Sequence, residues 1–549
     1  MLINLQNISK TIGAKKLYQD LDLMIQPGEK VGLIGRNGIG KTTLLGIMDG
    51  SDRDFGGTIE RRRGLVIAST AQEHHGLGKQ VVLEYILENL PEYGHLKHVI
   101  EQHPETMWDD MTLIAEYTDA LGRFSELGYY DIEERAQQEL SAFGLSAEHW
   151  NGPLEHLSGG QKRFVELVKV TLSEADLALI DEPTNHMDYV AKAAFIEWMK
   201  SYQQAVVVIT HDRDVLAEAD RIVEIKDQGS VSFKGNYAAY LKQNSQSTQS
   251  GVEQYEIAQR TLENLQKQLQ SVRAKKAGSS KNPNPFVPME RRLLKQYNDL
   301  AAKTVKPSFW IDQESMNEMK GKAVEKYDKY KAKNIRIGVK GEHGSRRLVD
   351  VEGLSLGYTK PLFEDVNFSL SVGERLELHG RNGAGKSTLV KAIRATSAGS
   401  TMEPKLFGGL INLDPKLTIG VYEQEIDERF LGMQLGAAVM AIHQEHNVAV
   451  NDQRVRQLLS DYLFDPTLDY KLEIRYLSGG QKARFQLIAM LCHNPSLLIL
   501  DEPTNHLDLP SIEELEKALE AYTGAILYIS HDSFFIQNLG GERVALEAV

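Results

Sequence analysis

The chain carries one ordered set of four motifs twice, and this duplication restricts its fold more than any other feature. The spacing recurs as well, since 23 residues separate Ser158 from Asp181 and 23 separate Ser478 from Asp501. Two long matching segments indicate a duplicated domain rather than a stack of small repeats. The repeated motifs are GRNGIGKTT and GRNGAGKST at 35–43 and 380–388, LSGGQK at 157–162 and 477–482, DEPTNH at 181–186 and 501–506, and ITHD and ISHD at 209–212 and 529–532.

The two copies enclose a third segment, which we expect to be a linker. A chain of 549 residues is too long for a single hydrophobic core. We therefore predict one domain at 1–240, called the first copy, and another at 346–549, called the second copy. The linker is predicted at 241–345.

The copies differ in one interval. Gln72 and Ser158 are 86 residues apart, whereas Gln424 and Ser478 are 54 apart. The extra residues have a helical and acidic pattern, so we place a helical insertion in the first copy at about 89–128. This insertion could contact a basic partner or simply cover the first copy, and the sequence favours neither.

Composition narrows the class of protein. Hydrophobic residues make up 42% of the chain and charged residues 25%, as in ordinary globular proteins. No apolar run approaches the roughly 18 residues of a membrane helix, and no signal peptide pattern is visible. The single cysteine, Cys492, excludes an internal disulfide and any cysteine-ligated metal cluster. We expect a cytoplasmic protein without a membrane span.

Charge is distributed unevenly along the chain. The net charge is −14, which by itself argues against nucleic acid. Residues 242–340, however, hold 20 Lys and Arg against 10 Asp and Glu, so the remainder carries −24. A basic linker between two acidic domains indicates a separate role for the linker.

Each glycine-rich motif lies between a short apolar strand pattern and an apolar helical pattern, the context in which it binds phosphate. The glycines let backbone N–H groups point at phosphate oxygens, and the helix N-terminus adds favourable partial charge. The lysine neutralises phosphate and the hydroxyl after it suits Mg²⁺. A turn without a ligand is the alternative, which the second occurrence makes less favoured. The predicted nucleotide-binding positions are Gly35, Asn37, Gly38, Gly40, Lys41, Thr42 and Thr43, and Gly380, Asn382, Gly383, Gly385, Lys386, Ser387 and Thr388.

An Asp-Glu pair ends a buried strand pattern in each copy. Adjacent buried acids are costly unless they bind cations or take part in chemistry. We assign Asp181 and Asp501 to Mg²⁺, and Glu182 and Glu502 to the catalytic base that polarises the attacking water. A solvated acidic turn is the weaker interpretation, because the same Pro-Thr-Asn-His follows in both copies.

Histidine and glutamine complete the predicted sites. His211 and His531 each follow the first acid of the pair by 30 residues, so we predict a catalytic contact with the γ-phosphate, with a structural histidine as the alternative. Gln72 and Gln424 are candidates for a nucleotide and Mg²⁺ contact, although a surface glutamine is the simpler interpretation. The predicted metal ligands are Thr42, Gln72, Asp181, Ser387, Gln424 and Asp501.

With LSGGQ added to these motifs, both copies resemble the ATP-binding cassette superfamily. The resemblance implies an α/β fold with two P-loop cassettes, ATP and Mg²⁺ as ligands, and hydrolysis of ATP to ADP and phosphate. It also implies a monomer whose cassettes pair head to tail around two ATP molecules. Ser158, Gly159 and Gly160 would then face the ATP held by Lys386, and Ser478, Gly479 and Gly480 the ATP held by Lys41.

Two cassettes joined by a long basic linker resemble the ABC-F class. GNYAAYLKQ at 235–243 and MKGKAVEKYDK at 319–329 also resemble that class. The resemblance implies binding to the ribosome, with the linker near the peptidyl-transferase centre and contacts to rRNA and tRNA. Regulation of translation, rescue of stalled ribosomes and protection from antibiotics all remain open. The ATPase subunit of a membrane transporter and a DNA-associated ATPase are the alternatives.

The first copy departs from the class in the residue expected to stack on adenine. Tyr358 fits this nucleotide-binding role in the second copy, but Ile12 occupies the aligned position in the first. The first copy also has Met187 where the second has Leu507. We therefore expect two unequal ATP sites.

The linker has a helical pattern with a break. Apolar residues from Tyr255 to Val272 follow the spacing of a coiled-coil seam, and a second helical stretch runs from Met316 to Tyr330. Gly and Pro residues at 277–288 interrupt the pattern. We predict a helical hairpin with a tip at about 277–310, which includes a further helical piece at 289–303.

Basic residues cluster near this tip, where they could neutralise RNA phosphates. An aromatic side chain among them could stack on a base or pack against RNA. A solvated spacer is the alternative, but a spacer needs neither a seam nor a charge opposite to that of its neighbours. The predicted RNA contacts are Arg273, Lys275, Lys276, Lys281, Phe286, Arg291, Arg292 and Lys295.

Overall fold

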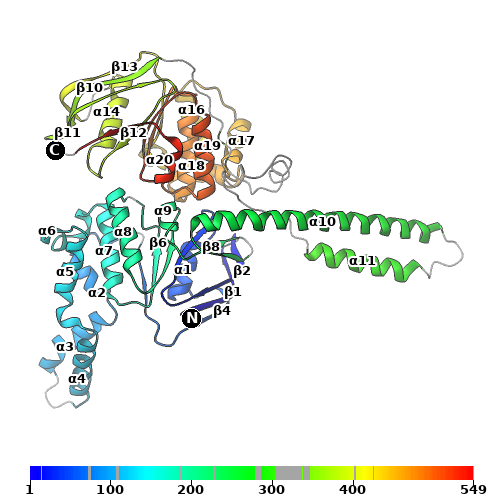
Figure 1. Ribbon diagram of the computed structural model, residues 1–549, viewed down its shortest axis with the longest axis horizontal. Helices are drawn as coiled ribbons and strands as arrows, with labels where there is room; N and C mark the ends of the chain where they lie inside the picture. Colours follow the sequence, from blue (N-terminus) through cyan, green and yellow to red (C-terminus); the bar gives the residue numbers. More distant parts are fainter. Residues whose placement is uncertain are drawn as a thin grey trace. The chain divides into compact units, whose positions relative to one another are not determined.

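The computed structural model of the chain is drawn in Figure 1. It describes residues 1–13, 15–71, 76–106, 111–185, 187–226, 229–278, 286–303, 335, 337, 346–400, 404–423 and 426–547. These residues form two compact units. One unit combines Met1–Tyr237 with Ile335–Val549 and so contains both motif copies, and the other is Ala238–Asn334.

The first copy is built around a mainly parallel sheet of six strands in the order β5-β6-β7-β3-β8-β9. The two strands β6 and β7 are buried throughout, as expected for apolar strands covered on both faces. Only β9 is antiparallel to its neighbour. The strands are β3 (Lys30–Gly35), β5 (Ile67–Ser69), β6 (Leu177–Asp181), β7 (Ala205–Ile209), β8 (Arg221–Ile225) and β9 (Ser230–Lys234).

The second copy repeats this arrangement with five parallel strands in the order β14-β15-β16-β12-β17. Its central strands β15 and β16 are likewise buried along their whole length. The strands are β12 (Arg375–His379), β14 (Ile419–Tyr422), β15 (Leu497–Asp501), β16 (Ala525–Ile529) and β17 (Glu542–Ala545). The predicted α/β chain with two matching P-loop domains is confirmed.

Each copy also has a three-stranded antiparallel sheet, with the order β2-β1-β4 in the first and β11-β10-β13 in the second. The buried side chains of these sheets join side chains of the parallel sheet in a shared hydrophobic core in each copy. The strands are β1 (Ile3–Ile12), β2 (Lys15–Ile25), β4 (Gly56–Arg61), β10 (Arg347–Gly357), β11 (Pro361–Ser371) and β13 (Lys405–Leu413).

Helices begin where the motifs predict them. Gly40 and Gly385 adopt left-handed backbone angles just before the helices α1 and α14. A Cβ atom there would lie 2.8 Å from Leu17 or 2.7 Å from Phe363, so only glycine fits. Ser158 and Ser478 each form a capping box with the glutamine three residues on, which starts α7 and α18. The helices around the sheets are α1 (Lys41–Asp49), α7 (Gly159–Leu172), α8 (Tyr189–Ser201), α9 (Arg213–Leu216), α14 (Lys386–Ala398), α18 (Gly479–Leu491), α19 (Leu509–Ala521) and α20 (Ser533–Leu539).

The segment before LSGGQK is helical in both copies and larger in the first. In the region of the predicted insertion, α3 (Tyr93–Thr106) and α4 (Met111–Glu126) lie side by side (Figure 1). Edge-to-face aromatic contacts join Tyr93 and Phe124 to Tyr129, which anchors this pair of helices. The remaining helices are α2 (Val82–Glu88), α5 (Ile132–Ala142) and α6 (Ala147–Trp150) in the first copy, and α15 (Glu428–Leu431), α16 (Leu435–Glu445) and α17 (Asp452–Asp461) in the second.

The unit between the copies contains two described helices, α10 (Tyr237–Gly278) and α11 (Phe286–Lys303). Leu269 and Val272 of α10 pack against Leu293 of α11, so α11 runs back along α10. The predicted second stretch at 316–330 lies outside the described residues. In the part of the chain that the structure describes, no helix is both long and apolar enough to cross a membrane.

Candidate nucleotide-binding sites

The glycine-rich motif of the first copy opens onto a cavity of about 900 Å³. Residues from both copies form its wall, and it extends as far as Glu502 and His531 near the second motif. The predicted residues in its wall are Asn37, Gly38, Gly40, Lys41, Thr42, Thr43, Gly159, Asp181, Glu182 and His211 from the first copy, and Ser478, Gly479, Gly480, Glu502 and His531 from the second.

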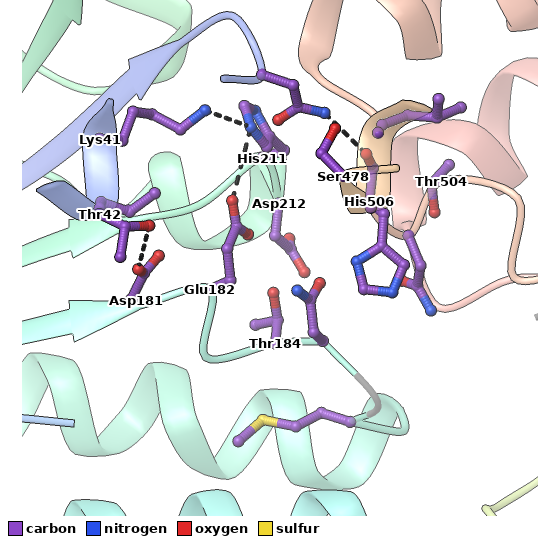
Figure 2. Close-up of a pocket in the computed structure, with 18 of the residues that line it drawn as sticks. Lys41, Thr42, Asp181, Glu182, Thr184, His211, Asp212, Ser478, Thr504 and His506 are labelled. Carbon is purple, nitrogen blue, oxygen red and sulfur yellow. Dashed lines mark hydrogen bonds and ion pairs between the residues drawn. The ribbon is translucent and has the colours of Figure 1, made fainter. Parts of the chain in front are cut away.

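Hydrogen bonds organise the polar groups of this first cavity (Figure 2). Thr42 donates its hydroxyl to Oδ2 of Asp181 at 2.7 Å. Nζ of Lys41 lies 3.1 Å from Nε2 of His211, and this ring nitrogen lies 3.6 Å from Oε1 of Glu182. The motifs are far apart in sequence, but parallel strands bring the ends of β3, β6 and β7 to one edge of the sheet.

Burial changes the protonation of these groups. It raises the pKa of Glu182 to about 8 and lowers the pKa of His211 to about 3, where the charge of Lys41 adds to the effect. The backbone of Glu182 has a φ of 43°, the left-handed region. Strained backbone of this kind is often retained at functional sites, and a carboxyl with a raised pKa suits a general base.

The second motif opens onto its own cavity of about 530 Å³. Ser387 donates to Oδ2 of Asp501 at 2.7 Å, and Oε1 of Glu502 lies 3.2 Å from Nε2 of His531. Burial raises the pKa of Glu502 to about 8 and lowers that of His531 to about 3. The predicted residues in its wall are Asn382, Gly383, Gly385, Lys386, Ser387, Thr388, Asp501, Glu502 and His531, together with Gly159 of the first copy.

Hydrogen bonds across the copies join each glycine-rich motif to the end of the other copy's DEPTNH segment. Asn37 donates its backbone N–H to Asp508 at 3.0 Å and its side-chain amide to the carbonyl of His506 at 2.8 Å. In the other direction, the backbone N–H of Asn382 donates to Asp188 at 3.1 Å. Both aspartates lie two residues after DEPTNH, and the sequence prediction of site residues missed them although both copies have an aspartate at that position.

The donor set of both cavities fits a magnesium ion bound with a nucleotide. A hydroxyl and a strand-end carboxylate lie within hydrogen-bonding distance in each, and Mg²⁺ prefers such oxygen ligands. Gly35 and Gly380 begin the two loops, and the lysine of each loop donates to that glycine's carbonyl. The two predicted glutamine ligands, Gln72 and Gln424, lie outside the described residues.

The expected adenine contacts differ in position. Ile12 lies in the wall of the first cavity and is exposed. Tyr358 is also exposed at the corresponding end of β10, but among the described residues the wall of the second cavity includes Leu362 and not Tyr358. Ser158, Gly159 and Gly160 were predicted to face the second ATP. Of these three, Gly159 lies in the described wall of the second cavity, and Ser158 and Gly160 do not.

The basic residues of the linker fall into two groups. Arg273 and Lys276 each form an ion pair of 2.8 Å with Glu290, a contact that the sequence did not reveal. Phe286 is half-buried beside the apolar contact of α10 with α11. Lys281 lies outside the described residues. Lys275, Arg291, Arg292 and Lys295 are exposed, as is Arg273 within its ion pair.

Comparison with known proteins agrees with this geometry. The ABC transporter family model matches residues 18–185 and 363–505. The chain is 30% identical over 531 residues to the "Probable ATP-binding protein YheS" of Escherichia coli (strain K12), covering 96% of this chain and 76% of the relative. It is also 30% identical over 552 residues to "ABC transporter F family member 2" of Arabidopsis thaliana, covering 98% and 75%.

A solved structure has a similar fold. It is the complex of archaeal ribosomal stalk protein aP1 and the ribosome recycling factor aABCE1, with a TM-score of 0.55 and 16% identity over 98% of this chain and 89% of that one. At this identity the likeness concerns the fold alone. The matched family model, the relatives and the paired glycine-rich and LSGGQ motifs together show that this chain belongs to the ATP-binding cassette family, and within it to the ABC-F group.

Proposed function

We propose that the chain hydrolyses ATP in both cavities and uses the pairing of its cassettes to act on the ribosome. The observation that carries this proposal is the composite cavity, in which Lys41, Glu182 and His211 of the first cassette share a wall with Ser478 and Gly479 of the second. Because one nucleotide would contact both cassettes, binding favours the paired state and hydrolysis weakens it.

Binding of the phosphates falls to the glycine-rich loop and its lysine. The backbone N–H groups before α1 and α14 point toward the phosphates, and Lys41 and Lys386 supply positive charge. Thr42 with Asp181, and Ser387 with Asp501, would hold a magnesium ion, which would supply positive charge to neutralise the phosphates. On the opposite wall, the N-terminus of the helix after each LSGGQ serine faces the γ-phosphate.

Glu182 and Glu502 are the proposed bases. Oε1 of Glu502 is buried and, apart from the approach of Nε2 of His531 at 3.2 Å, has no hydrogen-bond partner among the described residues, so an attacking water could donate to it. Each glutamate lies beside a neutral histidine, His211 or His531, which burial keeps uncharged. In this arrangement the carboxylate takes the proton of the water while the histidine orients the γ-phosphate.

The ribosome is the proposed partner because of the family and the exposed charge of the linker. One solved structure of similar fold, at a TM-score of 0.54 and 16% identity, is a "Model of ribosome-bound archaeal Pelota and ABCE1". In this chain, Arg291, Arg292 and Lys295 are exposed on α11, where they can reach RNA phosphates. The proposal covers three effects on translation: regulation, rescue of stalled ribosomes and protection from antibiotics.

The first test replaces Glu182 and Glu502 by Gln in one chain. The amide keeps the size of the side chain but cannot accept a proton, so ATP should bind and persist. We expect the variant to co-sediment with ribosomes in ATP, and to do so less in ADP. A variant that binds ATP yet stays in the free fraction under both conditions would contradict the ribosomal part of the proposal.

The second test neutralises Arg291, Arg292 and Lys295 with Gln. For RNA, each lost phosphate contact lowers the slope of log affinity against log salt by about 0.7, so three contacts predict a decrease of about 2. The matched control replaces three exposed basic residues of the cassettes, Arg53, Lys405 and Lys416. An equal effect of both triple variants on ribosome affinity would show that α11 has no special role.

A further inference from the structure

A cluster of two histidines and one cysteine lies in the second cassette, outside the nucleotide cavities. His446, Cys492 and His493 each offer one ligand atom, and these atoms lie within 4.8 Å of one another. None of the three is among the described residues that line either cavity. The proposed ATP chemistry therefore does not account for them.

Two helices end at this cluster. His446 is the C-cap of α16 and Cys492 is the C-cap of α18, and the two helices pack against each other. Asn447 and Asn494 follow with φ angles of 54° and 49°, which turn the chain away after each ligand. Helix C-termini carry partial negative charge, so two converging ends favour a cation.

The two imidazole rings lie close together. They stack with centroids 3.9 Å apart and planes 5° apart, so the exposed ring of His446 must turn out of the stack before both rings can point a nitrogen at one ion. Sγ of Cys492 lies 3.4 Å from Nδ1 of His493. Neutral imidazole nitrogens and a cysteine sulfur are both ligands that zinc accepts.

Contacts around the cluster support this arrangement. The backbone of Ile419 hydrogen-bonds to the His493 ring, and outer contacts of this kind orient histidine ligands. The nearby acid Glu445 is held by Arg429 at 2.9 Å and 3.1 Å, so it is already paired. One cysteine excludes a polynuclear thiolate cluster, but it leaves room for a site with one sulfur and two nitrogens.

We propose that His446, Cys492 and His493 bind a zinc ion. One thiolate and two imidazoles select a borderline transition metal over Mg²⁺ or Ca²⁺, which prefer oxygen ligands. Three protein ligands leave the fourth tetrahedral position to water, since His446 is exposed.

Binding requires loss of the thiol proton. The Sγ–metal bond forms as the S–H bond breaks, and the proton leaves to solvent. A bound ion would tie the end of α16 to the end of α18, the helix that begins at the LSGGQ motif of the second cassette.

The test is a titration of the purified full chain with Co²⁺ alone, in the absence of nucleotide. Cobalt replaces zinc and reports a bound thiolate by near-ultraviolet charge-transfer absorption. We expect saturation at about one equivalent, as for a single tetrahedral site, and loss of the band when Zn²⁺ is added. Absence of a thiolate band in the wild-type chain would overturn the proposal.

Variants identify the ligands. Cys492→Ser should abolish the thiolate band, and His446→Ala should weaken Co²⁺ binding at least about tenfold. His446 is exposed, so its replacement should leave the fold intact and keeps the test valid if a buried variant misfolds. The control is His98→Ala, an exposed histidine on α3, which should bind as the wild type does. Equal affinity of His446→Ala and His98→Ala would overturn the assignment.

Discussion

The two nucleotide cavities have matching reactive groups but different neighbours. In the first, His211 lies 3.1 Å from Nζ of Lys41 and 3.6 Å from Glu182. In the second, His531 lies closer to its glutamate, at 3.2 Å. The hydroxyl-to-aspartate bond is 2.7 Å in both cavities. Duplication has thus kept the atoms that would touch nucleotide and has varied what surrounds them.

An aromatic stack accompanies the second cavity, and aliphatic residues take its place at the first. Tyr189, at the start of α8, stacks on His379 with centroids 4.7 Å apart and approaches His531 at 6.4 Å. The corresponding positions on the other side are Leu509 and Ile34. Because Asp188 beside Tyr189 holds the second glycine-rich loop, this stack links that loop to the first cassette.

The charged contacts between the cassettes also differ between the two cavities. Lys192 of α8 pairs with Asp212 and Asp214 and donates to the backbone carbonyl of His531. At the positions of Lys192 and Asp214, the second cassette has Ile512 and Phe534. The second cassette therefore cannot form the equivalent ion pair. The contact therefore distinguishes the two cavities.

The largest predicted effect comes from Glu182→Gln and Glu502→Gln made singly. Loss of a general base costs about 100-fold or more at its own site. Since each ATP would contact both cassettes, one unhydrolysed ATP should also keep the other site closed. We expect either variant to lose well over half of the total turnover, by about tenfold or more, in a steady-state phosphate-release assay with ATP binding checked by filter retention.

A loss of only half in either single variant would show that the cavities work independently. A large loss in one variant and a negligible loss in the other would assign all turnover to one cavity. Either result would contradict the hypothesis that the shared walls couple two equivalent sites.

The next effect concerns the one-sided charge. Lys192→Met leaves the partly buried acids Asp212 and Asp214 without their cation, and breaking such a pair costs at most about 3 to 5 kcal/mol, the value for a fully buried pair. The counterpart Ile512→Val removes one methyl group from a buried position and should cost about 0.5 to 1.5 kcal/mol. Urea unfolding of the full chain, followed by circular dichroism, measures both, and equal midpoints would refute the asymmetry.

The sequence predicts a structural feature when the residues that form it belong to recognisable local motifs. Lys41 and Asp181 belong to motifs whose spacing fixes their place at strand ends, so the sequence predicted that they share a site, and the structure places them on one cavity. The fold class followed from the same repetition. In contrast, the contact of Tyr189 with His379 joins positions with no shared motif, so no periodicity reveals it.

The linker shows the same limit. The pattern predicted helices on both sides of the break at 277–288, and the structure has α10 and α11 there. It did not reveal that Glu290 would neutralise Arg273 and Lys276, because the pairing depends on the register of two helices. Similarly, a single cysteine gave no sign that a histidine distant in sequence would lie beside it and its neighbour.

A smaller effect is expected from Tyr189→Leu. This variant places a leucine beside the second cavity, as Leu509 is placed beside the first. Loss of an aromatic pair costs about 0.5 to 1.5 kcal/mol. If the stack supports the second glycine-rich loop, ATP affinity there should fall by about two- to tenfold. Titration with a fluorescent ATP analogue isolates that cavity when Lys41→Ala disables the first, and the same titration with Lys386→Ala serves as the control.

The smallest effect tests the adenine position. Ile12→Tyr gives the first cavity the aromatic residue that Tyr358 provides in the second cassette, and both positions are exposed ends of matching strands. An added aromatic contact at an exposed site is worth about 0.5 kcal/mol or slightly more, so ATP affinity of the first cavity should rise by about two- to threefold. In the same titration, Tyr358→Ile should lower the ATP affinity of the second cavity by a similar factor.

An unchanged affinity after Tyr358→Ile would show that this tyrosine does not stack on adenine, in line with its absence from the described wall of the second cavity. The inequality of the two sites would then rest on the Tyr189 stack and the Lys192 bridge alone.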